Sequence, residues 1–460
     1  RVDASKMLSN INFDLICLGF FLKYSVFIMR VIIASKYSYY IQLFNNEIKV
    51  PMNTEDKLVR PLEGVVVIDS THVLAGPYCT YQLALLGAEV IKIEPPVKGE
   101  ATRRLLENDP NYSVNGMGAY FYTLNRNKKS VAIDLKNTQG LEIFYKLVAK
   151  ADVVLSNFSA GVTNKLKIDF ENLKKINPKI ITCTVSGFGE SGPNFQRPAF
   201  DQIAQALGGG MSITGLSAQE PMRAGIPIGD LGGGMFAVMG IQAAIIDRAD
   251  SGVGQNVDIS MLDCQISMLN YMATMQTMSG IIPKPIGNSH FVHMPYNSFL
   301  TKDFPIVIAA VGDQFWPRLL KIFKNPELQN PIYETALERQ KDKDKLESIL
   351  QKELLKENSD YWLTKLENES VPCARVNNLE QAINDEQAQY RNMLVDVPHP
   401  EGGSAKIPGN PIKLSSVEDE EFLAPPLLGE HTKEVLEKWL EFSEDELIKL
   451  DEQQIIEIKK

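Results

Sequence analysis

The sequence predicts an α/β protein in which a doubly wound, mostly parallel sheet forms a large domain and a smaller α/β domain follows. Three observations support this prediction. Short β-branched runs alternate with helical stretches over residues 65–189, a glycine-rich apolar stretch follows at 208–263, and the character changes again after Pro283. The 460 residues also exceed the usual length of one compact domain.

The first strand–helix–strand repeat begins at Val65. VVVID at 65–69 is the kind of continuous apolar run that a strand buried on both faces shows. We expect a helix over 80–86 and further strands over 89–94 and 131–135. This rhythm is typical of a parallel sheet, because parallel neighbours need a long crossover connection.

The rhythm continues with a predicted helix over 141–151 and predicted strands over 152–158 and 179–189. In open, Rossmann-like sheets of this kind, ligands bind outside the carboxyl ends of the strands. The loops that we expect to border such a cleft are 69–77, 157–162 and 186–200.

The stretch 225–249 predicts a buried helix, because it is apolar on most faces after Asp230. We place Asp230 at the N-cap, where backbone N–H groups and the helix dipole would keep its carboxylate ionised. The glycines Gly232–Gly234 would then cost about 1 kcal/mol each relative to Ala. Either close approach of a ligand or close helix packing explains this cost. Asp230 is therefore a candidate functional residue, although Asp caps many helices.

After Pro283 an irregular stretch leads to a predicted strand at 305–311 and to helices rich in Lys and Glu over 342–368. Ser443 and Glu446 have the spacing of a capping box that opens the last helix. The predicted division is an extension at 1–51, a large domain at 52–265, a linker and small domain at 266–384, and a return to the large domain at 385–460.

The extension at 1–51 is expected to be disordered or non-native, with a targeting peptide as the alternative. Its apolar stretch 11–35 is interrupted by Asp14, Lys23 and Arg30, so it lacks the uncharged length that crosses a bilayer. We expect no membrane partner. The cysteines favour a reducing compartment, which we expect to be the cytoplasm, with the mitochondrial matrix as the alternative.

Composition excludes several other classes of function. The net charge of −10 provides no basic surface for a nucleic acid. Five scattered cysteines and five histidines without ligand spacing indicate neither a disulfide framework nor a metal site. The turn after the first strand lacks G-x-G-x-x-G, and the phosphate-loop, zinc-protease and serine-hydrolase motifs are absent from the sequence. The basic run RNKKS at 126–130 is either a solvated loop or a phosphate contact.

Six segments of the chain occur in a recognisable order. They are PLEGVVVIDSTHVLAGPYCTYQLALLGAEVIKIEPP at 61–96, LNRNKKSVAIDLK at 124–136, GFGESGP at 187–193, IGDLGGGM at 228–235, SGVGQNVDISMLD at 251–263 and PPLLGEHT at 425–432. Together they resemble the class III CoA-transferases (CaiB/BaiF type), which include formyl-CoA:oxalate, carnitine and succinyl-CoA:glutarate CoA-transferases. The resemblance extends from about Pro61 to Ile456.

The resemblance implies an enzyme that moves CoA from an acyl-CoA to a carboxylic acid, built as an interlocked homodimer. Asp230 matches the nucleophile of the family. Its carboxylate would attack the donor thioester to give an acyl-aspartyl anhydride, CoA would then form an aspartyl-CoA thioester, and the acceptor acid would take the CoA. The CoA thioester is a substrate, and the resemblance implies no permanently bound cofactor and no metal.

Other residues match family positions near the CoA and the acids. The resemblance places at the CoA site His72, Val73, Ala75, Gly76, Lys92, Arg103, Asn125, Arg126, Lys128, Lys129 and Lys136, of which the lysines and arginines would contact phosphates. It places at the substrate site Leu74, Phe200, Asp201, Gly232, Gly233, Asn288 and His290.

Departures from related patterns narrow the expected activity. Phe200 stands where related acyl-CoA racemases have a catalytic histidine, and Leu74 stands where formyl-CoA:oxalate transferases have glutamine. Together with GNSHFVHMPY at 287–296, they favour succinyl-CoA as donor and a dicarboxylate such as glutarate as acceptor. The alternatives are an acyl-CoA racemase or isomerase of the same superfamily and a non-catalytic CoA-binding protein.

Overall fold

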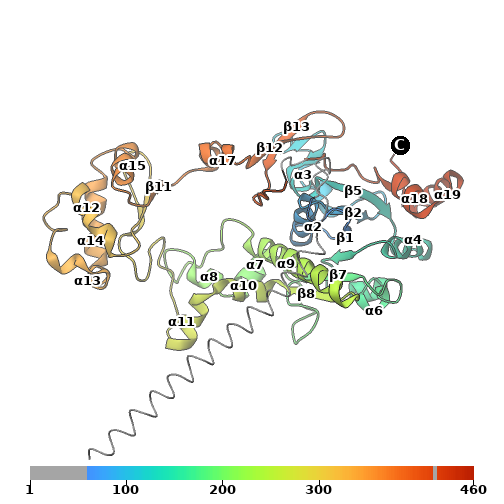
Figure 1. The fold of residues 1–460 in the computed structure, drawn as a ribbon, viewed down its shortest axis with the longest axis horizontal. Coiled ribbons are helices and arrows are strands. Elements are labelled where there is room, and N and C mark those ends of the chain that lie inside the picture. The colour runs from blue at the N-terminus through green and yellow to red at the C-terminus, as the bar shows by residue number, and fades with distance from the viewer. Residues whose placement is uncertain (1–59, 418–421, 460) are drawn as a thin grey trace, which may run out of the picture. The chain divides into compact units, whose positions relative to one another are not determined.

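The structure is a computed structural model that describes residues 60–417 and 422–459 (Figure 1). Our expectations for the extension at 1–51 lie outside the described residues.

A seven-stranded sheet lies at the centre of the fold, in the order β14-β5-β2-β1-β6-β7-β8. Six of its strands are parallel and β14 pairs antiparallel with β5 at one edge. The mostly parallel α/β sheet predicted from the sequence is thereby confirmed. The strands are β1 (Val66–Ser70), β2 (Glu89–Glu94), β5 (Lys128–Ile133), β6 (Val153–Ser156), β7 (Ile181–Ser186), β8 (Asn256–Ser260) and β14 (Ile456–Glu457).

Both faces of this sheet are covered by helices, because successive side chains of each strand point to opposite faces. In β1, Val67 belongs to one apolar cluster and Ile68 to the other. The first cluster includes side chains of α2 (Ala75–Leu85), α7 (Asp201–Leu207), α9 (Ile228–Ser251) and α10 (Met261–Leu269). The second includes side chains of α4 (Thr138–Val148), α6 (Phe170–Leu173), α18 (Thr432–Leu440) and α19 (Glu444–Glu452).

The chain reverses its direction of winding between β1 and β6, which are neighbours in the sheet. The strands before β6 extend the sheet to one side of β1, and β6, β7 and β8 extend it to the other. Loops that leave the carboxyl ends of β1 and β6 diverge at such a point and leave a crevice. The fold therefore positions a binding site after Ser70 and Ser156.

Two element boundaries differ from the sequence-based expectations. Helix α2 begins at Ala75 and not at Thr80, because Pro77 falls in the first turn, where the missing N–H has no partner to lose. Strand β5 begins at Lys128 and not at Val131, because the side chain of Lys128 is buried against the acidic Asp69.

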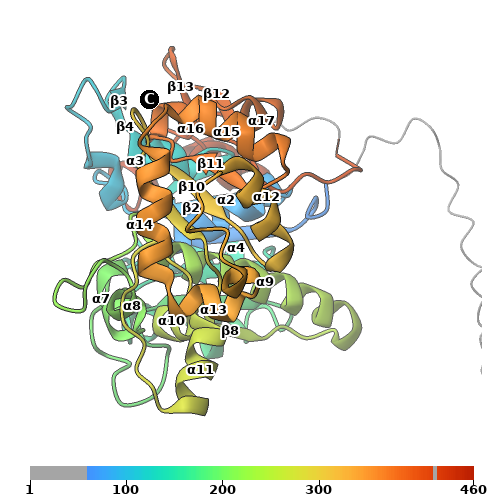
Figure 2. The same ribbon diagram turned by 90° about the vertical axis from the view of Figure 1, so that its left-hand side faces the viewer.

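A smaller antiparallel sheet is formed by β9 (Tyr296–Phe299), β10 (Ile306–Ala309) and β11 (Cys373–Arg375) in the order β11-β10-β9. Side chains of α12 (Trp316–Ile322), α14 (Lys343–Leu354) and α15 (Ser359–Asn368) form an apolar cluster with it. Figure 2 shows these three helices grouped around β10 and β11. Buried Arg339 of α13 (Ala336–Lys341) donates to the carbonyl of Met294 and pairs with Asp313. The strand and the helices expected in this region are present.

The remaining elements are short or lie near the carboxyl end. The hydroxyl of Tyr122 donates a 2.7 Å hydrogen bond to the carbonyl of Val397, which lies in the hairpin β12–β13. Ser443 and Glu446 form the predicted capping box of α19. These remaining elements are η1 (Ala101–Arg104), β3 (Ser113–Val114), β4 (Met117–Gly118), α3 (Ala119–Asn125), α5 (Val162–Leu166), α8 (Gly210–Ile213), α11 (Tyr271–Ser279), η2 (Asp313–Phe315), η3 (Pro331–Glu334), α16 (Leu379–Ile383), α17 (Glu386–Tyr390), β12 (Leu394–Pro398) and β13 (Ser404–Pro408).

Among the described residues, α9 is the one helix long and apolar enough to cross a membrane by length and composition. Helices inside globular cores meet the same test. Buried side chains of α9, such as Ala237 and Ile241, belong to the apolar cluster that covers one face of the sheet.

Candidate active site

A pocket of about 140 Å³ lies at the point where the winding of the sheet reverses. It is lined by the loops that follow β1, β6 and β7, and by Asp230 of α9. The three loops that we expected to border a ligand cleft therefore do so. The lining residues are His72, Val73, Leu74, Ala75, Asn157, Phe158, Ser159, Ala160, Val185, Ser186, Gly187, Phe195, Arg197, Pro198, Ala199, Phe200, Asp230 and Met261.

Asp230 lies in the first turn of α9, but it is not the N-cap. The N-cap position is Pro227, which has no side chain that could cap the helix. Asp201 of α7 caps α9 instead: its Oδ1 accepts hydrogen bonds from the backbone N–H of Gly229 at 2.7 Å and of Asp230 at 3.3 Å. The predicted cap was wrong because the true cap lies 29 residues earlier in the chain.

The position of Asp201 is itself fixed by Gln205, one turn further along α7. The side-chain amide of Gln205 donates to Oδ2 of Asp201 at 2.7 Å. The other end of that amide accepts from the backbone N–H of Ala224 at 2.9 Å. Asp201 therefore joins α7 to the turn that carries Asp230.

The carboxyl of Asp230 is less acidic than an ordinary aspartate. Burial and the negative charge of Asp201 raise the pKa of Asp230 to about 6. We expected the helix terminus to hold Asp230 ionised, and desolvation instead outweighs that effect. At neutral pH the carboxylate is still mostly ionised, and its higher basicity makes it a better nucleophile.

Tyr120 of α3 shares the electrostatic environment of Asp230. Burial, followed by the charges of Asp230, Glu100 and Asp201, raises the pKa of Tyr120 to about 12. The hydroxyl is therefore protonated at physiological pH and remains a hydrogen-bond donor. No local pattern in the sequence distinguishes Tyr120, because its environment comes from residues 20 to 110 positions away.

The turn between β1 and α2 forms one wall of the pocket and is held by two side chains. Asn157 accepts from the backbone N–H of His72 at 2.9 Å and donates to its carbonyl at 2.7 Å. Val73 has a φ of 65°, which is strained for a β-branched residue. Its N–H donates to the buried carboxyl of Glu100 at 3.2 Å. The turn is thus fixed by residues from two later segments.

The ring of His72 lies against Phe158, with 5.4 Å between the ring centroids. Burial, together with the charge of Lys92, lowers the pKa of His72 below its ordinary value. His72 is therefore neutral at physiological pH and offers an aromatic surface to the pocket.

Several basic residues that the resemblance placed at the CoA site are instead buried in internal contacts. Lys128 pairs with Asp69 at 2.9 Å, and Lys92 donates to the carbonyl of Thr71 at 2.8 Å. Burial lowers the pKa of Lys128 to about 8, and the charge of Asp69 opposes that shift. The amino groups of Lys92 and Lys128 thus bind to residues at the start of the β1–α2 turn. Neither lysine lines the pocket.

Internal contacts also occupy the side chains of Arg103, Asn125 and Arg126. Arg103 makes two 2.7 Å hydrogen bonds to Glu94, and Asn125 accepts from Lys128. The guanidinium of Arg126 lies between the rings of Tyr81 and Phe422, at 4.7 Å from each. RNKKS is therefore not a solvated loop, and the phosphate role predicted for these side chains conflicts with their burial.

The other two predicted phosphate contacts lie away from the pocket as well. Lys129 is half-buried and pairs with Glu89 and Glu434. Lys136 is exposed in the loop after β5. Neither lines the pocket that contains Asp230.

The glycines after Asp230 are explained by packing and not by a ligand. A Cβ on Gly232 would meet Met268 at 2.6 Å, and one on Gly233 would meet Met261 at 3.2 Å. A Cβ on Gly234 would lie 2.7 Å from the carbonyl oxygen of Ala75 in α2. Gly232 and Gly233 are not among the residues that line the Asp230 pocket, and their role at the substrate site stays a prediction.

Asn288 and His290 also lie outside the Asp230 pocket as the structure describes it. The amide of Asn288 donates to Ser298 at 2.8 Å. His290 stacks on Phe291 and His293, and its Nδ1 accepts from two backbone N–H groups. By contrast Ala75 and Leu74 do line the pocket, and so does Phe200, which is 71% exposed. Gly76 is buried in the first turn of α2.

The pocket residues that sequence reasoning missed include Asn157, Phe158, Ser159 and Arg197. Arg197 is exposed, and its guanidinium lies 5.6 Å from the ring of Phe188. The first three belong to a loop that we expected to border the cleft, so the position of that loop after a strand was the available signal.

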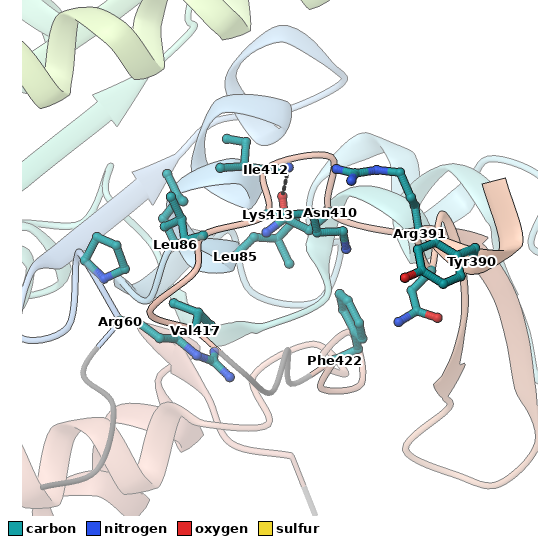
Figure 3. A pocket seen from close by; sticks show the side chains of 13 residues that line it. Arg60, Leu85, Leu86, Tyr390, Arg391, Asn410, Ile412, Lys413, Val417 and Phe422 are labelled. Carbon is teal, nitrogen blue, oxygen red and sulfur yellow. Dashed lines mark hydrogen bonds between the residues drawn. The ribbon is translucent and has the colours of Figure 1, made fainter. Parts of the chain in front are cut away.

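A different pocket, drawn in Figure 3, lies between the end of α2 and residues of the segment 390–417 together with Phe422. Arg60, Arg391 and Lys413 contribute basic groups, and Ile412 donates its N–H to Asn410 at 2.9 Å. None of its lining residues belongs to the Asp230 pocket. Within the described residues, no group of three His, Cys, Asp or Glu side chains is placed to hold a metal ion.

The chain is similar to known proteins over most of its length. The model of the family described as CoA-transferase family III matches residues 62–432. A Mus musculus protein named succinyl-CoA:glutarate CoA-transferase is 35% identical over 393 residues, which are 85% of this chain and 89% of that protein. An Acetobacter aceti protein named acetyl-CoA:oxalate CoA-transferase is 37% identical over 361 residues, 78% of this chain and 90% of that protein.

The fold is similar to that of a solved structure as well. The crystal structure of a CAIB/BAIF family protein from Brucella suis aligns with a TM-score of 0.73 and 33% identity, and the alignment covers 83% of this chain and 100% of that chain. The chain therefore belongs to CoA-transferase family III and is an enzyme that transfers CoA.

Proposed function

We propose that the enzyme moves CoA from succinyl-CoA to a dicarboxylic acid such as glutarate, with Asp230 as the covalent nucleophile. The observation that carries this proposal is the position of Asp230: a carboxylate with a pKa of about 6 lies in a pocket at the switch point of a parallel sheet. The pocket residues Phe200 and Leu74 provide no group that could exchange the α-proton required by a racemase.

In the first half of the reaction, a carboxylate oxygen of Asp230 attacks the carbonyl carbon of the donor thioester. The new C–O bond forms as the C–S bond breaks, and CoA leaves as a thiolate with the electron pair. The thiolate then attacks the Asp230 carbonyl carbon of the anhydride. This step forms an aspartyl-CoA thioester and releases the donor acid as a carboxylate.

In the second half, a carboxylate oxygen of the acceptor attacks the aspartyl-CoA thioester and again releases the CoA thiolate. The thiolate attacks the acceptor carbonyl of the new anhydride, which forms the product thioester and restores the carboxylate of Asp230. No net proton, electron or phosphate is consumed. The energy of the thioester bond is retained throughout the sequence.

Two groups near Asp230 can stabilise the negative charge that develops in these steps. The first is the N-terminus of α9, where the helix dipole favours an oxyanion although the N–H groups of Gly229, Asp230 and Leu231 already donate to Asp201 and Pro227. The second is the neutral hydroxyl of Tyr120, whose raised pKa keeps it a donor. Neither the helix terminus nor the Tyr120 hydroxyl changes its own charge when it stabilises the oxyanion.

The loops around the pocket suggest how CoA is held. The rings of His72 and Phe158 offer stacking surfaces for the adenine. Arg197 contributes a basic side chain to the pocket lining and can bind the phosphates of CoA. This assignment replaces the buried lysines as the proposed phosphate contacts.

The mouse relative is named for succinyl-CoA and glutarate, and the Acetobacter relative for acetyl-CoA and oxalate. Both acceptors in these names are dicarboxylates, which supports that class for this enzyme. The leucine at 74, in place of the glutamine of formyl-CoA:oxalate transferases, favours the glutarate type.

We propose further that the enzyme is a homodimer. The supporting observation is the number of large apolar side chains that are exposed on helices α7, α9 and α11. They are Ile203, Leu207, Met235, Met239, Ile246, Tyr271, Met275 and Met278.

The proposal is tested by assaying transfer from succinyl-CoA to glutarate with Asp230→Asn. We expect a loss of at least about 1,000-fold in kcat, because the neutral amide cannot form the anhydride. The matched control is Asp247→Asn, an exposed aspartate near the other end of α9, which should keep normal activity. An Asp230→Asn enzyme that transfers CoA normally would refute the nucleophile. Loss of the α-proton to D₂O without transfer would instead support the isomerase alternative.

A further inference from the structure

Gln205 of α7 is almost completely buried, with 2% of the residue exposed, and it lies outside the lining of the Asp230 pocket. A buried amide needs an acceptor for its amino group and a donor for its oxygen. Within the described residues, both partners of this side chain belong to segments that hold or precede the turn of Asp230. The amide of Gln205 is therefore placed to influence the nucleophile without contact with a substrate.

Hydrogen bonds connect Gln205 to the backbone of Asp230 in two steps. The Nε2 of Gln205 donates to Oδ2 of Asp201 at 2.7 Å, and its Oε1 accepts from the N–H of Ala224 at 2.9 Å. The other oxygen of Asp201, Oδ1, accepts from the N–H groups of Gly229 and Asp230. A continuous path thus joins the loop before α9, the helix α7 and the first turn of α9.

The bond from Gln205 determines which oxygen of Asp201 faces α9. The two oxygens of a carboxylate are equivalent, and the torsion that exchanges them has broad minima, so Asp201 alone does not fix their positions. With Oδ2 held by Gln205, Oδ1 is left to accept from the two N–H groups of α9. An apolar side chain at 205 would fill the same space but would hold neither Asp201 nor Ala224.

A second buried glutamine holds the opposite side of the same turn. Gln265 of α10 is 6% exposed and donates to the carbonyl of Ile228 at 3.2 Å. The N–H groups of the turn are thus held from α7, and one of its carbonyls is held from α10. Such fixed geometry matters for catalysis, because a displacement of about 1 Å can lower a rate about 100-fold.

We propose that Gln205 is a positioning residue for CoA transfer: it orients the carboxylate of Asp201, which in turn fixes the backbone of Asp230 for attack on the thioester. The inference rests on the proposed function, in which Asp230 is the nucleophile. It adds a residue that acts on the chemical steps and leaves substrate binding unchanged, because Gln205 does not line the pocket.

Steady-state kinetics of Gln205→Met, with succinyl-CoA and glutarate, test this division between chemistry and binding. We expect kcat to fall about 10- to 100-fold while the KM values change less than about 2-fold. The matched control is Gln202→Met, at an exposed glutamine of the same helix, which should keep kcat within about 2-fold. A normal kcat in Gln205→Met would overturn the inference.

A double-mutant cycle with Asp201→Ala distinguishes positioning through Asp201 from a general loosening of α7. If Gln205 acts through Asp201, adding Gln205→Met to Asp201→Ala should change kcat by less than about 2-fold. Equal losses of kcat in the two backgrounds would contradict the proposed role.

The variant Gln205→Glu provides a pH signature that a loss of packing does not produce. Burial beside the carboxylate of Asp201 should raise the pKa of the new carboxyl well above that of an ordinary glutamate. While protonated, this carboxyl donates to Asp201 as the amide does; once ionised, it repels Asp201. The ratio of its kcat to that of the unaltered enzyme should therefore fall as the pH rises from about 6 to about 9. Gln202→Glu should show a constant ratio, and a constant ratio in Gln205→Glu would also overturn the inference.

Asp230→Asn, assayed on the same day, separates this inference from the proposed function. Normal transfer by Gln205→Met beside an inactive Asp230→Asn refutes only the positioning role. Normal transfer by Asp230→Asn refutes the nucleophile and the positioning role together. Should Gln205→Met fail to fold, the pH dependence of Gln205→Glu decides the question.

Discussion

Asp201 has two effects on Asp230 that oppose each other. Its carboxylate caps the helix that carries Asp230, and its charge helps to raise the pKa of Asp230 to about 6. The cap positions Asp230, while the charge keeps part of the Asp230 carboxyl protonated at acidic pH. Replacing the carboxylate by an amide keeps an oxygen for the cap and removes the charge.

The pH dependence of kcat/KM should therefore respond to Asp201→Asn. In the unaltered enzyme we expect activity to fall as pH drops through about 6, because protonated Asp230 cannot attack the thioester. In Asp201→Asn this fall should move to lower pH by up to about 1 unit. Asp247→Asn should leave the profile unchanged. An unshifted profile in Asp201→Asn would show that Asp201 does not influence the reacting carboxyl.

The ionised carboxylate of Asp230 should also reduce the stability of the fold. Since the pKa of Asp230 is raised from 3.8 to about 6, the folded protein binds this proton more tightly than the unfolded chain does. Ionised Asp230 thus costs stability above pH 6, and the cost disappears below about pH 4. Asp230→Asn should raise the free energy of unfolding by about 1–3 kcal/mol at pH 8 and by much less at pH 4. Denaturant unfolding at both values checks this, and equal changes would contradict it.

At the level of elements, the crossing of α2 and α9 decides how closely the pocket wall approaches Asp230. The crossing depends on Gly234, because a Cβ there would lie 2.7 Å from the carbonyl oxygen of Ala75. Backbone atoms cannot move away as a flexible side chain can. The helices must therefore shift apart if Gly234 gains a side chain.

Gly234→Ala should lower the free energy of unfolding by about 1–3 kcal/mol and reduce transfer activity. Gly210→Ala, in α8, is the control, because its Cβ would have only ordinary contacts at 3.7 Å or more. That substitution should be neutral or slightly stabilising. Chemical denaturation of the two variants measures the difference. A Gly234→Ala protein as stable as the unaltered one would show that the helices can separate without cost.

The elements show which features a sequence reveals. Strand β2 was predicted with its observed bounds, because EVIKIE is a local apolar pattern. Lys128 was left outside the predicted strand since its partner Asp69 lies 59 residues away, and no local pattern reveals that ion pair. The same reason explains the missed cap of α9 by Asp201. Asp230 itself was singled out by its place before an apolar, glycine-rich helix and then by its motif, whereas the pocket around it required the positions of the three loops.

At the level of the whole molecule, the exposed apolar side chains on α7, α9 and α11 predict that the isolated chain is not the functional form. Sedimentation or light scattering should give about twice the chain mass of 51.4 kDa. Charged substitutions in this surface, such as Met278→Glu at a side chain that is 82% exposed, should weaken the association and reduce activity. Lys175→Glu, at an exposed residue just beyond the C-terminal end of α6, should leave the mass unchanged. A monomer with full activity would contradict the proposed dimer.

The covalent role of Asp230 is tested most directly by mass spectrometry of the enzyme after incubation with succinyl-CoA and quenching with hydroxylamine or borohydride. We predict a modification of the peptide that contains Asp230, formed by the unaltered enzyme and absent from Asp230→Asn. An unmodified peptide, in an enzyme that transfers CoA to glutarate under the same conditions, would contradict the aspartyl intermediate.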